Sequence, residues 1–111
     1  MYQTRNIVRQ LIRQSNRVAN VLRWNPTESD AHIQMKLEVC KYLHRHGIEF
    51  YTEAILKDGS GRCDIIAADI ELIIEIAESE TDTSLAEKQR KYPLRMVVIR
   101  TSQKFDGRLL N

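Results

Sequence analysis

The sequence lacks any stretch of the roughly 20 apolar residues that a membrane-spanning helix needs, and its N-terminus lacks the apolar core of a secretory signal. It contains only two cysteines, Cys40 and Cys63. These are too few for a ladder of disulfides and are typical of small core residues in a reducing compartment. The sequence also has no internal repeat and no low-complexity segment. These absences predict a cytoplasmic protein without a membrane segment.

Charge of one sign is missing from two parts of the chain. Residues 1–27 contain five arginines and no acid, whereas residues 64–86 contain no lysine or arginine. The net charge of the whole chain is nevertheless only +2. The acidic stretch is either a solvated edge or a site where a bound cation offsets the carboxylates, which leaves the arginine-rich segment free to meet phosphates.

The residues that are present predict one small α+β domain. A chain of 111 residues that is 42% hydrophobic can bury a single core. Apolar periodicity and turn signals predict a helix over 29–46, strands over 48–56, 61–68 and 69–77, a helix over 84–92 and a strand over 94–100. The first three strands form an antiparallel meander, and the last returns through a right-handed crossover to lie parallel to the third. The result is an αβββαβ core with a mixed central sheet.

An additional amphipathic helix is predicted over residues 4–23. Its arginines recur every four residues beside an apolar stripe, at Arg5, Arg9, Arg13 and Arg17. This stripe either follows a nucleic-acid backbone without reading its sequence, or it is a solvated edge of a helix that packs on the core or on a second subunit. We therefore divide the chain into an N-terminal basic segment (1–28), for DNA contact or dimerisation, and a core domain (29–111).

Two carboxylates in the predicted hairpin are expected to share a face. If the reversal centres on Ala68 and Asp69, Asp64 lies opposite Ile73 and diagonally across from Glu75. Both acids then reach one divalent ion. A shift of one residue would separate them, so the prediction depends on the register.

The order of elements, with a glutamate on the first core helix, resembles the PD-(D/E)XK, or restriction-endonuclease-like, nucleases, near archaeal Holliday-junction resolvases and phage or plasmid nucleases. The resemblance covers roughly residues 29–101. It assigns the family's acidic positions to Glu38, Asp64 and Glu75. The family's third-strand motif ends in a lysine where this sequence has Ala77, and the lysine of such a variant is expected on the next helix, at Lys88, with Lys91 as the weaker candidate.

The resemblance implies a metal-dependent endonuclease that hydrolyses phosphodiester bonds of DNA in recombination or repair, with structure-selective cleavage and a homodimer as further expectations. RNA is left open as a substrate. Mg²⁺ or Mn²⁺ would be held by Asp64, Glu75, the Ile76 carbonyl and Glu38, with Lys88 as a catalytic group and Arg62 on a phosphate. The alternative function, favoured by Ala77, is a catalytically inactive nuclease-fold protein that binds nucleic acid or serves in assembly.

Each residue assignment has a structural alternative. Asp64 and Glu75 would otherwise be paired surface acids that repel each other. Glu38 would be a solvated partner of Lys41 or Tyr42, Lys88 an exposed helical lysine, and Arg62 the partner of a nearby acid. Glu53 is a further candidate for the acidic site, whereas His32 is expected to face solvent.

Overall fold

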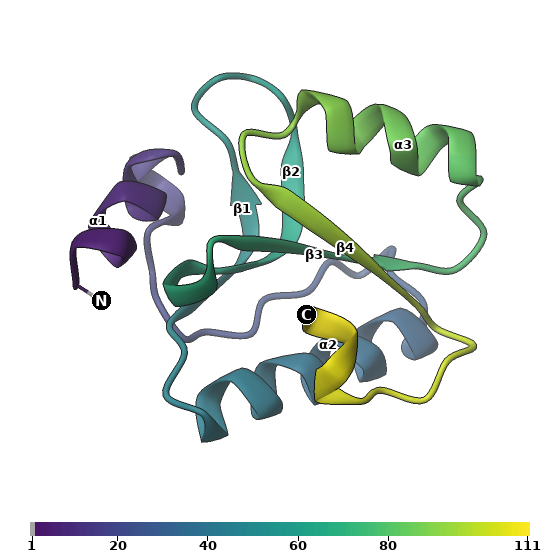
Figure 1. Ribbon diagram of the computed structural model, residues 1–111. Coiled ribbons are helices and arrows are strands. Elements are labelled where there is room, and N and C mark those ends of the chain that lie inside the picture. Colours follow the sequence, from purple (N-terminus) through teal and green to yellow (C-terminus); the bar gives the residue numbers. More distant parts are fainter. Residues whose placement is uncertain (1) are drawn as a thin grey trace.

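The computed structural model describes residues 2–111 and confirms the predicted α+β class (Figure 1). The elements along the chain are α1 (Tyr2–Gln10), α2 (Asp30–Arg45), β1 (Phe50–Ile55), β2 (Arg62–Ala67), β3 (Leu72–Ala77), α3 (Asp82–Lys91) and β4 (Arg95–Arg100). Short 3₁₀ turns follow α1, separate β2 from β3 and close the C-terminus, at Gln14–Asn16, Ala68–Ile70 and Gly107–Leu110. Within residues 2–111, no helix has both the length and the apolar character needed to cross a bilayer.

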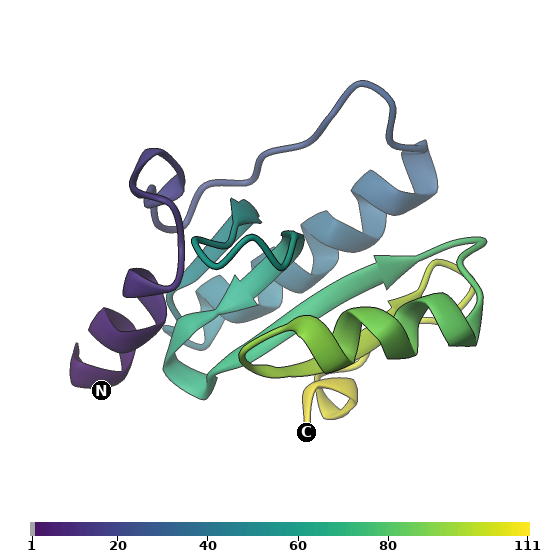
Figure 2. The ribbon, with the colours of Figure 1, turned by 90° about the horizontal axis from the view of Figure 1, so that it is seen from above.

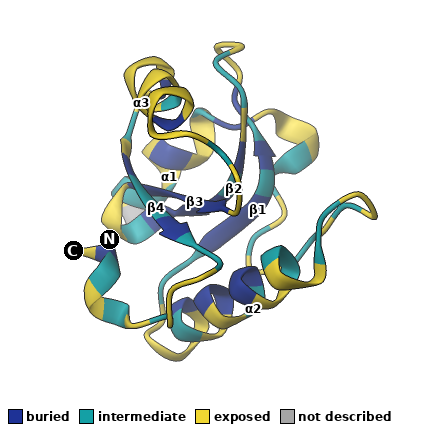
Figure 3. Ribbon diagram, turned by 90° about the vertical axis from the view of Figure 1, so that its right-hand side faces the viewer, coloured by how far each residue is buried: buried dark blue, intermediate teal, exposed yellow. Residues whose placement is uncertain are grey.

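One four-stranded mixed sheet, in the order β1-β2-β3-β4, forms the centre of the molecule. The first three strands pair antiparallel, and β4 pairs parallel to β3 after the α3 crossover, as predicted. Helix α2 and the C-terminal turn cover one face of the sheet, while α1 and α3 lie toward the other (Figures 1 and 2). Figure 3 shows the buried strands between these two layers. Both cysteines are buried and unpaired, as expected of core residues.

The N-terminal helix is shorter than predicted, so the prediction of a helix over residues 4–23 was wrong. Helix α1 ends at Gln10, and the chain then runs along the edge strand β1. There Ile12 forms an antiparallel bridge with Leu56, and the Arg13 N–H donates to the Ile55 carbonyl at 2.8 Å. An edge strand offers unpaired backbone groups, and their pairing together with the burial of Ile12 outweighs the more than three further turns of helix that were predicted. The arginines at 5, 9, 13 and 17 therefore do not form one helical stripe.

The hairpin register differs from the expected one by two residues. The observed pairs include Ile66 with Ile73 and Ile65 with Ile74, because the reversal uses the Ala68–Ile70 turn and a left-handed residue, Glu71 at φ 49°. Since side chains alternate along a strand, a two-residue shift leaves every side chain on its predicted face. Asp64 and Glu75 consequently remain on a common face and come closer together than expected.

Both core helices begin with a side-chain cap. The Ser29 hydroxyl accepts a hydrogen bond from the His32 N–H at 3.1 Å and starts α2 at the predicted position. Helix α3 starts at Asp82, two residues before the predicted start, because the Thr81 hydroxyl rather than Ser84 caps it. The first turn of α2 and helix α3 both lie near the end of the sheet where β2 begins and β3 ends (Figure 1).

Candidate active site

Three carboxylates lie in a row across three neighbouring strands. On β1, Thr52 pairs with Ile65 and Ala54 pairs with Cys63, so the unpaired Glu53 between them stands opposite Asp64. Continuing the β2–β3 register past Ile65 and Ile74 places Asp64 opposite Glu75. Glu53 has a left-handed backbone, at φ 50°, which costs energy for a residue other than glycine. The sheet is thus interrupted on both sides of Asp64, and carboxylates occupy the interruption.

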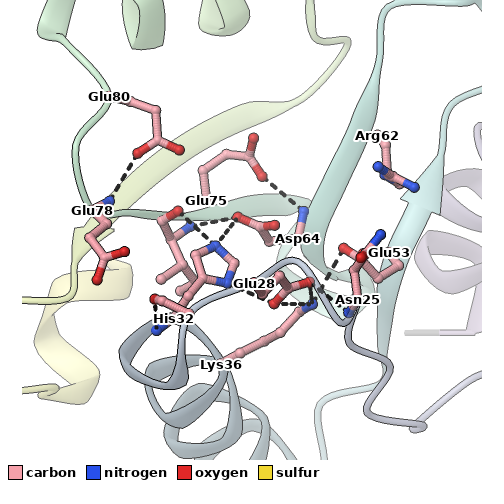
Figure 4. A network of polar contacts seen from close by, with 12 residues as sticks. Asn25, Glu28, His32, Lys36, Glu53, Arg62, Asp64, Glu75, Glu78 and Glu80 are labelled. Carbon is pink, nitrogen blue, oxygen red and sulfur yellow. Dashed lines mark hydrogen bonds and ion pairs between the residues drawn. The ribbon is translucent and has the colours of Figure 1, made fainter.

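The side chains of Asp64 and Glu75 replace the missing rungs of the β2–β3 ladder. The Asp64 N–H donates to Glu75 Oε2 at 2.8 Å, and the Ile76 N–H donates to Asp64 Oδ2 at 2.8 Å (Figure 4). Each carboxylate is therefore held by the backbone of the opposite strand. This reciprocal bonding fixes both groups without lysine or arginine from the sheet itself.

The two carboxylates ionise differently because their surroundings differ. Glu75 is only 3% exposed, and burial followed by the negative charge of Asp64 raises its pKa above the usual range. Burial also opposes ionisation of Asp64, but His32 and the Ile76 N–H outweigh it and lower the pKa of Asp64. A buried glutamate beside an ionised aspartate is the arrangement that a bound cation would stabilise.

Helix α2 contributes a charged network below the carboxylate row. His32 Nδ1 lies 2.8 Å from Glu28 Oε2, and its Nε2 lies 3.1 Å from the Ile76 carbonyl oxygen and 3.6 Å from Asp64 Oδ2. The Asp64 carboxylate, with Glu28, outweighs burial and raises the pKa of His32 to about 9. The ring is therefore a cation at neutral pH and donates from both nitrogens.

Lys36 extends this network to β1. Its ammonium is fully buried and lies 3.1 Å from Glu28 Oε1 and 3.3 Å from Glu53 Oε2. A lysine is buried in this way only when its charge is paired. The lysine thus ties Glu28, directly before the N-cap of α2, to Glu53, the first member of the carboxylate row (Figure 4).

Sequence reasoning missed Glu28 and Lys36, and its expectation that His32 faces solvent was wrong, since that side chain is 14% exposed. The signal was their spacing, because residues 28, 32 and 36 recur every four positions along one side of the start of α2. A histidine and a lysine on one side of α2, with an acid directly before its N-cap, need polar partners from another element. The sheet carboxylates provide those partners.

Helix α3 approaches the row from the other face of the sheet. Lys88 Nζ and the Tyr92 hydroxyl each lie 3.3 Å from Glu75 Oε1. These two residues are four apart and so project from the same side of the helix. Ala77, where the resembling nucleases have lysine, is fully buried. The structure therefore brings the ammonium of Lys88 to the glutamate from α3.

A comparison with protein families matches residues 28–96 to the family described as Competence protein CoiA, nuclease-like domain. The matched region spans more than half of the chain and contains every side chain of the site built above. The chain belongs to this family. Comparisons with curated proteins and with solved structures found no match. Membership in a nuclease-like family agrees with the resemblance to a nuclease superfamily, while assignment to the PD-(D/E)XK group stays a prediction.

In this CoiA nuclease-like domain the site lines an open cleft of about 230 Å³. Three cationic side chains, His32, Arg62 and Lys88, share the lining with five carboxylates. These carboxylates are Glu28, Glu53, Asp64, Glu75 and Glu80. Such a mixture suits an anionic group that is bound together with a cation, and it disfavours an apolar ligand.

The structure does not bring Glu38 to this cleft. Glu38 is exposed on α2 and lines a separate pocket with Lys41, Tyr42 and Arg45. The helical repeat of 3.6 residues turns position 38 away from the side that carries His32 and Lys36. The Ile76 carbonyl does lie at the site, where it already accepts the bond from His32.

The arginines assigned to nucleic acid are divided among several environments. Arg5 is ion-paired with Asp69, Nη2 to Oδ2 at 3.0 Å, and Arg17 donates from Nε to the Ile12 carbonyl at 2.9 Å. Arg9 is exposed on α1. Arg13 and Arg62 are exposed and line one shallow pocket, and Arg62 also lines the cleft. Arg62 lines the cleft itself, and Arg13 shares the neighbouring shallow pocket with it. Of the five arginines, these two are therefore placed along a path that leads to the cleft.

That the cleft holds Mg²⁺ or Mn²⁺ stays a prediction. Among residues 2–111, no group of three or more His, Cys, Asp and Glu side chains is arranged to enclose a metal ion. Mg²⁺ in phosphoryl-transfer sites commonly takes one or two carboxylates and completes its shell with waters and substrate phosphate. Asp64 and Glu75, held on one face of the sheet, offer the one or two carboxylates of that pattern, and each of them also faces a cationic side chain, His32 or Lys88.

Proposed function

We propose that this CoiA nuclease-like domain hydrolyses phosphodiester bonds in nucleic acid, with DNA as the first candidate, at the cleft formed by β2, β3, α2 and α3. The observation that carries the proposal is the position of Lys88 Nζ, 3.3 Å from Glu75 Oε1. The other oxygen of the same carboxylate, Glu75 Oε2, accepts the hydrogen bond from the Asp64 N–H. Two acids and a lysine converge here from three elements, although the lysine is absent from the strand itself.

Asp64 and Glu75 would hold a Mg²⁺ or Mn²⁺ ion, with the second lone pair of the Ile76 carbonyl as a further oxygen ligand. The ion would supply charge stabilisation for the anionic transition state and a water acidic enough to attack phosphorus. Lys88 would orient that water or contact the phosphate oxygens through its ammonium. The Tyr92 hydroxyl, 3.3 Å from Glu75 Oε1, restrains the same carboxylate from the α3 side.

The α2 network would act by holding this arrangement. His32 donates to the Ile76 carbonyl and faces Asp64, so it orients two of the oxygen ligands at once. Lys36 pairs with Glu28 and Glu53 and so offsets one of the two negative charges that they place near an incoming phosphate. Arg62 lines the cleft and would bind another phosphate of the nucleic-acid strand that is cleaved. Homodimer formation and preference for branched or nicked DNA remain predictions from the resemblance.

The second candidate is a nuclease-fold protein that binds nucleic acid without cleaving it. The fully buried Ala77 supports this candidate, because the strand carries no motif lysine. The position of Lys88 opposes it, since an ammonium reaches the same carboxylate by another route.

The experiment that tests the proposal measures cleavage of labelled linear, nicked and four-way DNA and of RNA, with Mg²⁺, with Mn²⁺ and with chelator. We expect metal-dependent cleavage by the wild type and its loss in Asp64→Asn, Glu75→Gln and Lys88→Met. Glu38→Gln is the matched control, because it neutralises an exposed carboxylate outside the cleft.

Cleavage that persists in Asp64→Asn and Glu75→Gln would reject the assigned site. Binding of the same nucleic acids by a wild type that cleaves none of them would favour the second candidate.

A further inference from the structure

The single tryptophan of the sequence is exposed beside the cleft. Trp24 lies in the connection between the Gln14–Asn16 turn and α2, and 55% of its surface is accessible. Large aromatic side chains dominate the energetics of binding surfaces, so an exposed tryptophan next to a cleft is a candidate contact. Val21, three residues earlier, is also exposed.

The connection, residues 20–29, is held in place on both sides of Trp24. Before it, the Asn20 N–H donates to the Phe50 carbonyl and the Arg23 N–H donates to Thr52 Oγ1, both at 2.8 Å. After it, the Asn25 N–H donates to Glu28 Oε1 at 3.1 Å. The backbone that carries Trp24 is therefore anchored on β1 and, through the pairing of Glu28 with His32 and Lys36, on α2, so this part of the chain loses little entropy when the ring stacks on a ligand.

The same segment forms one side of the cleft. Asn25, which Figure 4 shows near Glu53, lines the cleft together with Thr27, Asp64 and Glu75. Trp24 is the residue directly before this lining in the sequence. In Figure 3 the connection projects as a loop beside the first turn of α2. A chain of nucleotides with one phosphate in the cleft would thus have a neighbouring base within reach of this loop.

Charge favours nucleic acid over an apolar protein surface as the partner. Arg23 directly precedes Trp24 in the sequence, and Arg62 and Lys88 line the adjacent cleft. A partner that is polyanionic and also presents flat aromatic faces matches both properties. Nucleic acid with accessible bases is such a partner.

We propose that Trp24 stacks on the base of an unpaired nucleotide adjacent to the phosphate in the cleft, so that the preferred ligand is single-stranded nucleic acid or an unpaired end or flap. The bases of a duplex are covered on both faces by their neighbours, so a side chain can stack only on a base that has left the helix. The assignment of the cleft rests on the proposed function, whereas the stacking contact can be measured without any cleavage.

The test uses the intrinsic fluorescence of Trp24, which reports on this residue alone because the chain has no other tryptophan. Asp64→Asn protein is titrated with an oligothymidylate, and separately with a duplex of the same length, in buffer with chelator. We expect strong quenching by the single strand and little by the duplex. Trp24→Ala should bind a dye-labelled single strand roughly 5- to 150-fold more weakly, and Trp24→Phe should retain most of the affinity.

Ile7→Ala is the matched control, because Ile7 is an exposed apolar residue of α1 outside the cleft lining. It should leave single-strand affinity unchanged. Single-strand affinity that is the same in Trp24→Ala and in wild type would overturn the inference and leave the exposed ring to a protein partner. Equal quenching by duplex and single strand would overturn it as well. If the wild type cleaves nothing but oligothymidylate still quenches Trp24, the proposed function fails while the stacking contact stands.

Discussion

Replacing Lys36 by methionine tests whether the buried network supports the site. The substitution keeps the length of the side chain and removes its charge, which leaves Glu28 and Glu53 facing each other without the ammonium that lies 3.1 and 3.3 Å from them. At an effective dielectric constant of about 20, two unit charges about 3 Å apart attract by about 5 kcal/mol, and desolvation of the buried ammonium offsets part of this attraction. Breaking a buried pair typically costs about 3–5 kcal/mol, so we expect Lys36→Met to lower the free energy of unfolding by that amount.

The assay is urea unfolding followed by circular dichroism at pH 7, on Lys36→Met alone and in combination with Glu28→Gln and Glu53→Gln. The triple variant should recover most of the lost stability, because it carries no unpaired charge in the network. A loss below about 1 kcal/mol in Lys36→Met, or a triple variant less stable than Lys36→Met, would refute the reasoning, since either result means that the ammonium does not neutralise the two glutamates.

Three further predictions concern single contacts. Lys88→Met should slow cleavage by about 10²–10⁴-fold because the ammonium at Glu75 is lost, while Lys91→Met, which changes an exposed lysine of the same helix, should leave the rate unaltered in a single-turnover assay. His32→Gln should slow cleavage by about 10–100-fold and raise the Mg²⁺ concentration needed for half-maximal rate, and an unchanged Mg²⁺ dependence would argue against its positioning role. Asp69→Asn should lower the free energy of unfolding by about 1.5–3 kcal/mol, because Asp69 accepts from Arg5 and from the Glu49 N–H, whereas Asp106→Asn, at an exposed ion pair, should change little. Arg5 and the Glu49 N–H lower the pKa of Asp69, so the contribution of Asp69 to the free energy of unfolding is present above its unfolded-state pKa of about 3.9. This contribution is lost as the pH falls through the lower folded-state pKa. If the stability of Asp69→Asn decreased as steeply with acid as that of the wild type, this reasoning would be contradicted.

Much of the fold was predictable because local signals agreed with the final packing. The hairpin was marked by β-branched residues on both sides of a reversal. The predicted turn was wrong, but each side chain still lies on its predicted face, because the register shifted by two residues, an even number. The resemblance placed the displaced lysine on the helix after the third strand, and Lys88 does lie beside Glu75, while its catalytic role stays a prediction. The caps and Gly47 bounded α2 correctly.

The remaining features depended on contacts that periodicity does not encode. The apolar pattern of residues 4–23 is helical, yet residues 11–13 leave the helix and form hydrogen bonds with the chain at the edge strand β1. Glu38 was assigned from the resemblance, as the glutamate of the first core helix. The face of α2 that meets the sheet is instead defined by Met35, Val39 and Leu43 in the core and by His32 and Lys36 at the site. The left-handed Glu53 had no local signal, because a glycine would be expected at such a backbone position.

The central claim is that Asp64 and Glu75 together hold a divalent cation, and the most direct measurement is a crystal structure of the protein grown or soaked with Mn²⁺, with the ion located by its anomalous scattering. We expect one anomalous peak within direct coordination distance of both carboxylates, and we expect it to disappear in crystals of Glu75→Gln. A peak at another place, such as the pocket lined by Glu38, or a peak that persists in Glu75→Gln crystals, would contradict a shared cation at Asp64 and Glu75.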